Sequence, residues 1–210
     1  MKNNYDRIAG YYDVLSRMVY FRAQMKAQID QLSAIPVNST ILIAGGGTGW
    51  ILEEIARIHP SGLKITYVEI SSKMLDISKK RDVKANTVTY IHSAMEDFKT
   101  TALYDVIITA FFFDNFAADS VGTVFNQLNG LLKSGGLWLF SDFYYTEKSG
   151  KVWQRLLLQA MYSFFSKISA VEAKSLINTE HLFEERLYSP LNTSFYYRRF
   201  IKSIIYRKPD

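Results

Sequence analysis

The stretch Ile41-Leu42-Ile43-Ala44-Gly45-Gly46-Gly47-Thr48-Gly49-Trp50 decides the fold class of this chain. Its first four residues are a continuous apolar run, which is typical of a strand buried on both faces. The glycine cluster that follows predicts a tight turn. From Trp50 to Ile58 the apolar residues recur at helical spacing, so the stretch reads as a strand, a glycine turn and a helix.

The same alternation continues along the chain. Further strands are predicted at residues 64–68, 87–91, 104–109 and 137–140, and helices begin near residues 71 and 119. This pattern predicts an α/β fold, a doubly wound, mostly parallel sheet. Two last strand-like segments, residues 182–188 and 200–206, are joined by residues 189–192, which are too few for a crossover helix. They are therefore expected to pair antiparallel.

Length and composition favour one globular domain. The chain has 210 residues, 48% of them hydrophobic, and a net charge of +5. It contains no cysteine, which excludes disulfides, a zinc finger and a thiol nucleophile. No apolar run is long enough for a spanning helix or a signal peptide, so a cytoplasmic protein is expected. Within the single domain we expect a helical cap at residues 1–38, a cofactor-binding core at 39–148, and a helix with a terminal hairpin at 149–210.

The glycine loop predicts a nucleoside site. In doubly wound sheets ligands bind beyond the carboxyl ends of the strands, where Gly45 and Gly47 allow a ligand close to the backbone. Glu69 follows the next strand at the offset at which a carboxylate reaches a ribose diol. A dinucleotide site is disfavoured, because Trp50 stands where its third glycine is required.

The chain resembles the class I S-adenosylmethionine-dependent methyltransferases. The resemblance rests on residues 41–49, 67–75, 104–108 and 131–137, in the order and spacing of that family. Residues 5–13 also resemble the start of small methyltransferases that act on quinones and phospholipids. The family implies a seven-stranded Rossmann-like sheet closed by an antiparallel hairpin, and methyl transfer to a small, partly apolar or aromatic acceptor by in-line displacement.

The resemblance also implies a cofactor site for S-adenosyl-L-methionine. The glycines would lie along the methionine and ribose, Glu69 would hold the ribose hydroxyls, and Ile70 and Met74 would flank the adenine. Two residues depart from the family: Ile43 and Ser93 stand where acidic residues are usual. The expected cofactor-binding residues are Tyr12, Ala44, Gly45, Gly47, Gly49, Glu69, Ile70, Met74, Ser93, Ala94, Met95 and Ala110.

Catalysis of methyl transfer requires alignment, and a base only where the acceptor must lose a proton. The topology places Asp142 and Asp114 just after two strands, and His181 in the late segment. Each of the two aspartates also fits a loop cap or a surface group. An aromatic acceptor pocket is predicted from Phe111, Phe112, Phe113 and Tyr144.

The expected partner is a small-molecule methyl acceptor. The three histidines are scattered, so no metal is expected, and nucleic acid is not expected as a partner. The basic and aromatic residues 196–208 fit RNA binding, and they also fit an edge strand protected by charge. A non-catalytic cofactor-binding module, an RNA methyltransferase and peripheral membrane contact stay open as alternatives, as does the oligomeric state. Residues 1–30 are predicted to form a lid over the glycine loop.

Overall fold

The computed structural model describes residues 21–145, 152–154 and 177–210. Tyr12 lies outside these ranges, as do residues 1–20 of the predicted lid and most of the predicted helix after residue 149.

A single seven-stranded sheet forms the centre, in the order β3-β2-β1-β4-β5-β7-β6. Strands β1 to β5 are parallel, and β7 pairs antiparallel with both β5 and β6. The predicted α/β fold with its mostly parallel sheet and antiparallel terminal hairpin is confirmed. The strands are β1 Thr40–Ala44, β2 Ser61–Glu69, β3 Ala85–His92, β4 Tyr104–Ala110, β5 Leu132–Phe143, β6 Ser189–Tyr196 and β7 Ile201–Arg207.

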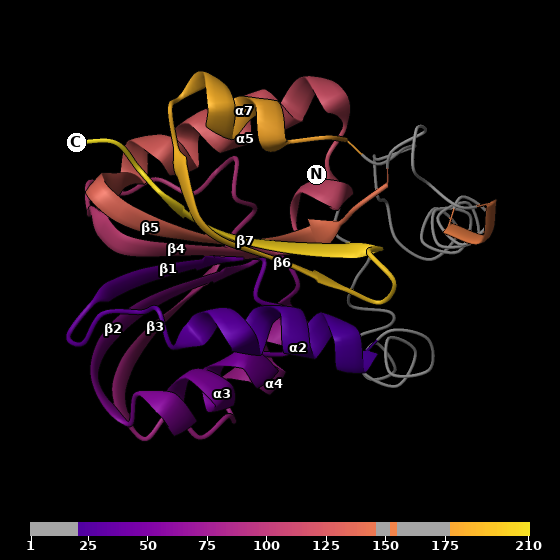
Figure 1. The fold of residues 1–210 in the computed structure, drawn as a ribbon. Coiled ribbons are helices and arrows are strands. Elements are labelled where there is room, and N and C mark those ends of the chain that lie inside the picture. Colours follow the sequence, from indigo (N-terminus) through magenta and orange to yellow (C-terminus); the bar gives the residue numbers. More distant parts are fainter. Residues whose placement is uncertain (1–20, 146–151, 155–176) are drawn as a thin grey trace.

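Helices cover both faces of the sheet. Figure 1 shows α5 and α7 on one face and α2, α3 and α4 on the other. The helices are α2 Phe21–Leu32, α3 Trp50–Ile58, α4 Ser72–Ser78, α5 Ala118–Leu131 and α7 Glu180–Glu185, with a 3₁₀ turn η2 at Phe113–Asn115.

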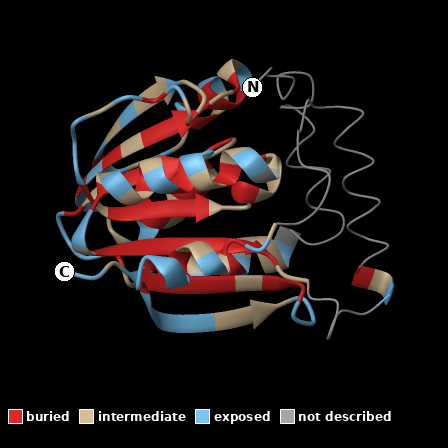
Figure 2. Ribbon diagram, turned by 90° about the horizontal axis from the view of Figure 1, so that it is seen from above, coloured by how far each residue is buried: buried red, intermediate tan, exposed pale blue. Residues whose placement is uncertain are grey.

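Strand β1 lies in the middle because its side chains are apolar on both sides. Ile41 and Ile43 belong to the core beneath α2, α3 and α4, whereas Leu42 and Ala44 belong to the core beneath α5 and α7. Successive side chains of a strand point to opposite faces, so a run without polar residues must be covered twice. Figure 2 shows the buried strands in the centre and the exposed outermost strand, β6, at one edge.

The core beneath α5 and α7 is unusually aromatic. Trp138 of β5 stacks on Phe125 of α5 with ring centres 5.0 Å apart, and its Nε1 donates to Thr109 Oγ1 at 2.8 Å. Phe183 of α7 stacks on Tyr206 of β7 at 4.0 Å. Much of the aromatic content therefore stabilises the packing of α5 and α7 on the sheet.

The predicted strand at residues 182–188 is wrong. Glu180–Glu185 forms α7, and the strand before β7 begins later, at Ser189. A short helix turns Phe183 into the aromatic core, which a solvent-facing strand would not do. Pro190 lies inside β6, where the pairing with β7 is irregular between Pro190 and Asn192. Proline is tolerated there because β6 is an edge strand.

Hydrogen bonds to the Ala27 carbonyl and from the Gln31 side chain fasten helix α2 to the sheet. The Ala27 carbonyl accepts hydrogen bonds from Ser141 Oγ at 3.3 Å and Ser203 Oγ at 2.8 Å, and Gln31 Nε2 donates to the Phe140 carbonyl at 3.0 Å. Residues 21–30 of the predicted lid thus pack on the face of β5 and β7. The lid function of residues 1–20 stays a prediction.

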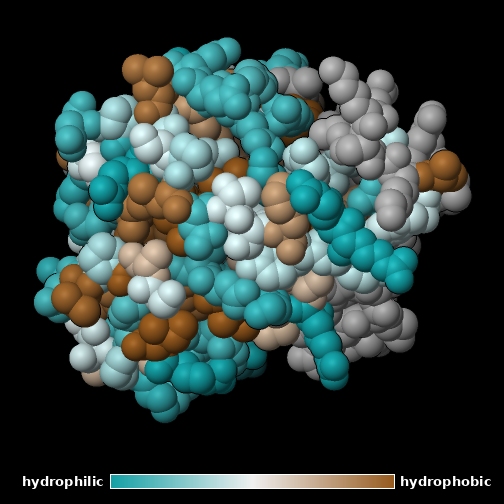
Figure 3. All heavy atoms as spheres, viewed as in Figure 1, coloured by the Kyte–Doolittle hydropathy of each residue, from teal (hydrophilic) through white to brown (hydrophobic). Residues whose placement is uncertain are grey.

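The surface shows separate apolar patches. On the face in Figure 3, hydrophobic atoms form several patches interrupted by hydrophilic ones. Exposed large apolar side chains include those of Val37, Leu103 and Leu187, which lie in different segments. Among the described residues, no helix has the length and apolar character needed to cross a membrane.

The contact between α3 and α4 depends on Gly49, and this can be tested. Gly49 has a φ of 77°, and a Cβ atom there would come within 2.8 Å of the Ser78 Cα. We expect Gly49→Ala to lower the free energy of unfolding by about 2–4 kcal/mol, through backbone strain and overlap. Chemical denaturation measures this change.

The matched control is Gly122→Ala inside α5, where a Cβ atom meets nothing within 4 Å. This variant should be unchanged or more stable by up to about 1 kcal/mol, because alanine favours a helix interior. Equal stability of the two variants would contradict the packing argument.

Candidate functional site

The glycine loop lies at the carboxyl end of β1, between β2 and β4. Gly45 and Gly47 have left-handed φ angles of 67° and 64°. The Tyr67 hydroxyl donates to the Gly47 carbonyl at 2.8 Å, which supports the loop from below. The Phe112 ring lies against Gly45, where a Cβ atom would come within 2.6 Å of Phe112 Cδ2. The loop is thus held between an aromatic side chain of β2 and one that follows β4.

The Glu69 carboxylate ties the loop to the next strand. Its Oε2 accepts from the Gly47 N–H and its Oε1 from the Ser71 N–H, both at 2.8 Å. The side chain is only 5% exposed. Burial raises the pKa of Glu69, and the N–H groups of Ser71 and Gly47 offset part of that rise. The two N–H groups therefore hold the Glu69 carboxylate against the loop, beside the pocket.

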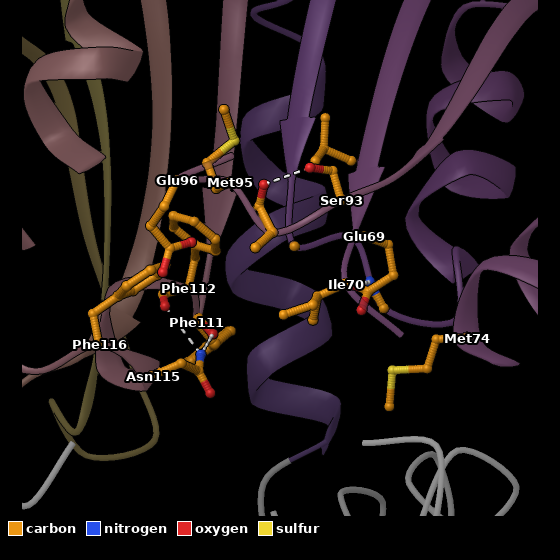
Figure 4. A pocket seen from close by; sticks show the side chains of 14 residues that line it. Glu69, Ile70, Met74, Ser93, Met95, Glu96, Phe111, Phe112, Asn115 and Phe116 are labelled. Carbon is orange, nitrogen blue, oxygen red and sulfur yellow. Dashed lines mark hydrogen bonds between the residues drawn. The ribbon is translucent and has the colours of Figure 1, made fainter. Parts of the chain in front are cut away.

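A pocket opens between the loop and the segments after β2, β3 and β4. Figure 4 shows Glu69, Ile70 and Met74 on one side, and Glu96, Phe112 and Phe116 on the other. Its lining residues are Gly45, Gly47, Val68, Glu69, Ile70, Met74, Ser93, Ala94, Met95, Glu96, Phe111, Phe112, Asn115 and Phe116.

Eight of the predicted cofactor-binding residues line this pocket. They come from three separate segments, residues 45–47, 69–74 and 93–95, which the parallel sheet brings to one edge. Their roles toward a ligand stay predictions. The eight are Gly45, Gly47, Glu69, Ile70, Met74, Ser93, Ala94 and Met95.

Three other predicted cofactor-binding residues do not line the pocket. Ala44 is buried in the core beneath α5, and Gly49 lies against Ser78 of α4. Ala110 is half-buried at the end of β4, opposite Ser141 of β5. Strand ends therefore contribute to the site less than the loops that follow them.

The predicted acceptor residues lie in two groups. Phe111 and Phe112 line the pocket. Phe113 does not: it is 1% exposed and lies among the rings of Phe125 and Trp138, because the η2 turn directs it into the core. Tyr144 is half-buried, and its ring lies 5.5 Å from that of Phe195.

Sequence reasoning missed three lining residues: Val68, Glu96 and Asn115. Phe116 also lines the pocket and belongs to the aromatic segment after β4 where the acceptor was expected. Asn115 Nδ2 donates to the carbonyls of Phe111 and Phe112 at 3.0 Å, so it shapes the turn after β4. Glu96 comes three residues after Ser93 in the loop after β3, and that spacing was the available signal. Val68 gave no signal distinct from that of core residues.

Asp114 and Asp142 form a carboxyl pair next to the pocket, in which Asp142 is buried and Asp114 is half-buried. Asp114 follows β4, whereas Asp142 lies inside β5, one residue before its end, and not after the strand as expected. The Phe111 N–H joins the two strands at this end by donating to the Ser141 carbonyl at 2.8 Å. Burial raises the pKa of Asp114 to about 7. Burial and then the charge of Asp114 raise the pKa of Asp142 well above its ordinary value. The pair therefore holds a proton near neutral pH, beside Asn115 of the pocket wall.

His181 lies on α7, which contributes no residue to the pocket lining. It is exposed, and its Nδ1 lies 2.8 Å from the Asn178 carbonyl oxygen. Across the described ranges, no three His, Cys, Asp or Glu side chains are grouped so as to hold a metal ion.

Sequence comparison connects the core of the chain to known proteins. The sequence model of the methyltransferase domain family matches residues 41–136. The ubiquinone/menaquinone biosynthesis C-methyltransferase UbiE of Geotalea daltonii is 27% identical over 146 residues. The match covers 66% of this chain, and the chain spans 61% of the length of that curated relative.

Solved structures share the fold across almost the whole chain. The N-methyltransferase NodS from Bradyrhizobium japonicum, in complex with S-adenosyl-L-homocysteine, superimposes with a TM-score of 0.74 at 14% identity, over 100% of both chains. The 1,6-didemethyltoxoflavin-N1-methyltransferase of Burkholderia thailandensis, with bound 1,6-didemethyltoxoflavin and S-adenosylhomocysteine, gives a TM-score of 0.66 at 16% identity, over 99% of this chain and 87% of that one.

The carboxyl pair predicts a pH-dependent cost to folding. A raised pKa in the folded protein means that stability falls as pH rises from the ordinary value of 3.8 through the raised values. We expect Asp142→Asn to be more stable than wild type by about 1–3 kcal/mol at pH 8, and this gain to vanish near pH 4. Urea denaturation at both pH values measures it.

Asp105→Asn is a control of opposite sign. Burial alone would raise the pKa of Asp105, but hydrogen bonds from Lys133 and the Thr40 N–H lower it overall. Its carboxylate is therefore expected to stabilise the protein above pH 4, and Asp105→Asn should be less stable at pH 8. A stability gain in Asp142→Asn that is the same at every pH would contradict the raised pKa values of the carboxyl pair.

Proposed function

We propose that this chain carries a class I S-adenosylmethionine-dependent methyltransferase domain. In this proposal it transfers a methyl group from S-adenosyl-L-methionine to a small, partly apolar or aromatic acceptor. One observation carries the proposal. A single pocket joins the glycine loop, the Glu69 carboxylate and an aromatic wall at the carboxyl edge of the sheet. These are the parts that a nucleoside cofactor with an adjoining acceptor requires.

The residues present fit the cofactor. The open side of Gly47, where a Cβ atom would meet nothing within 4 Å, leaves space next to the backbone for the methionine part. Glu69 offers its remaining lone pairs to the ribose hydroxyls, and Ile70 and Met74 give apolar contact for the adenine. The cofactor supplies an already activated methyl group, so the chain mainly has to align the acceptor.

The acceptor side of the pocket is aromatic. Phe112 contacts Phe116 edge-on at 4.9 Å, and Phe111 contacts Phe143 at 5.0 Å, so these rings form a fixed wall. Such a wall favours a flat or apolar small molecule. The bound 1,6-didemethyltoxoflavin in the Burkholderia thailandensis structure, and the quinone pathway in the UbiE name, support this acceptor class.

The carboxyl pair is proposed as the proton acceptor for an oxygen, nitrogen or carbon acid. Because burial raises the pKa of both groups, the pair can take up a proton near neutral pH without leaving two buried charges. Asn115 Nδ2 donates to Asp114 Oδ1 at 2.8 Å and lines the pocket, which places Asp114 one residue from the acceptor wall. Asp114 and Asp142 thus act as one base.

Cofactor binding is the first test. We expect S-adenosylmethionine and S-adenosylhomocysteine to bind in calorimetry with Kd values of roughly micromolar or weaker, and NAD not to bind. Glu69→Ala should weaken binding by about 1–3 kcal/mol, because a charge-assisted hydrogen bond is lost. The control, Glu184→Ala on exposed α7, should bind like wild type. Unchanged affinity in Glu69→Ala would place the site elsewhere.

Methyl transfer is the second part of that test. Labelled cofactor is screened against quinols, phenols, amines, lipids and RNA, and transfer to a small aromatic acceptor is expected. Transfer to RNA alone would contradict the proposed acceptor class. Cofactor binding without any transfer would favour a non-catalytic binding module.

The base has its own kinetic signature. We expect the rate of the wild type to rise with pH through about 7 as the pair loses its proton. Asp114→Asn should lower kcat by about 10²- to 10⁴-fold, remove this limb, and leave cofactor affinity unchanged. The control is Asp119→Asn, in the exposed first turn of α5. A wild-type pH limb retained in Asp114→Asn would rule out the pair as the base.

A further inference from the structure

We propose that the pocket distinguishes the cationic sulfonium form of the cofactor from its neutral thioether product by charge, and that Glu96 is the residue responsible. This inference rests on the proposed function and deepens it. It concerns which of two nearly identical ligands the chain retains, and therefore how the product leaves.

The described ionisable side chains that line the pocket all carry the same sign of charge. Among the residues that the structure describes, the ionisable side chains of the lining are Glu69 and Glu96, and none of these lining residues is Lys, Arg or His. This contrasts with the chain as a whole, whose net charge is +5. A pocket lined in this way favours a ligand with a positive charge.

The two carboxylates are in different states. Glu69 is buried, and its oxygens accept from the Gly47 and Ser71 N–H groups at 2.8 Å, so its charge is already partly compensated. Glu96 is half-buried. Among the described residues, its carboxylate makes neither a hydrogen bond nor an ion pair. Lys99 Nζ donates to the backbone carbonyl of Glu96 at 3.1 Å and leaves the carboxylate itself without a partner among these residues. Glu96 thus brings to the pocket a carboxylate that is less compensated than that of Glu69.

Aromatic rings accompany Glu96. Figure 4 shows it on the side of the pocket that carries Phe112 and Phe116, across from Glu69. Phe111 also lines this pocket. Ring faces attract cations, and a carboxylate beside such rings adds a Coulombic attraction that is stronger in a half-buried pocket than in water.

The sulfonium cofactor and the thioether product share the adenine, ribose and amino acid parts. They differ by one methyl group and one positive charge. Hydrogen bonds to the shared parts therefore stabilise both ligands alike, whereas the charge of Glu96 and the phenylalanine rings stabilise the sulfonium form. Loss of the charge at methyl transfer then weakens the hold on the product.

Calorimetry of Glu96→Gln with both ligands tests this. Glutamine keeps the length and the hydrogen-bonding oxygen of the side chain but removes its charge. We expect the Kd for S-adenosylmethionine to rise by about 5- to 10-fold and the Kd for S-adenosylhomocysteine to change by less than about twofold. The thermal midpoint and circular dichroism of the variant check that it is folded.

Asp97→Asn is the matched control. It removes the same charge one residue further along, from an exposed side chain outside the pocket lining. Solvent screening should leave both Kd values within about twofold of wild type. An equal loss of both ligands in Glu96→Gln would mean that Glu96 binds a shared part such as the adenine, and would overturn the proposal. No loss of either ligand would overturn it as well.

The result separates this inference from the function on which it rests. Wild-type protein that binds neither ligand would contradict the proposed function, and this inference with it. Wild-type protein that binds both, with equal losses in Glu96→Gln, would leave the proposed function standing and contradict charge selection alone.

Discussion

The buried Glu69 carboxylate connects three segments that are far apart in the sequence. Its hydrogen bonds to the Gly47 and Ser71 N–H groups join the loop after β1, the end of β2 and the start of α4. Without these N–H donors a charge so little exposed would carry a large desolvation cost. The loop conformation, the position of α4 and the open side of the pocket therefore depend on one another through this side chain.

The fold was predictable because its signals are periodic. The apolar run 41–44 needs cover on both faces, and this places β1 in the middle of a parallel sheet whatever its neighbours are. The prediction for residues 182–188 was wrong because their apolar residues fit a strand and a short helix equally well. The helix is the form in which the Phe183 ring contacts Trp138. Contacts that distant in sequence leave no local pattern.

Which residues line the pocket was predictable in part, for the same reason, whereas their roles toward a ligand stay predictions. Residues next to strand ends reached the pocket, since the topology brings those ends together. Asn115 was missed because its position depends on the η2 turn, and Phe113 was directed inward by that turn. A run of three identical residues cannot show which ring faces the core, since side-chain packing settles that.

The edge strand β6 has a consequence for how copies of this protein meet in a crowded solution. An exposed edge offers free backbone groups on which a strand of another molecule can continue the sheet. Pro190 lacks an N–H, and the irregular pairing between Pro190 and Asn192 bends the ladder out of register there. A second molecule thus finds no long, even row of donors and acceptors to extend. The irregular pairing in the hairpin therefore protects the protein against polymerisation at the β6 edge of the sheet.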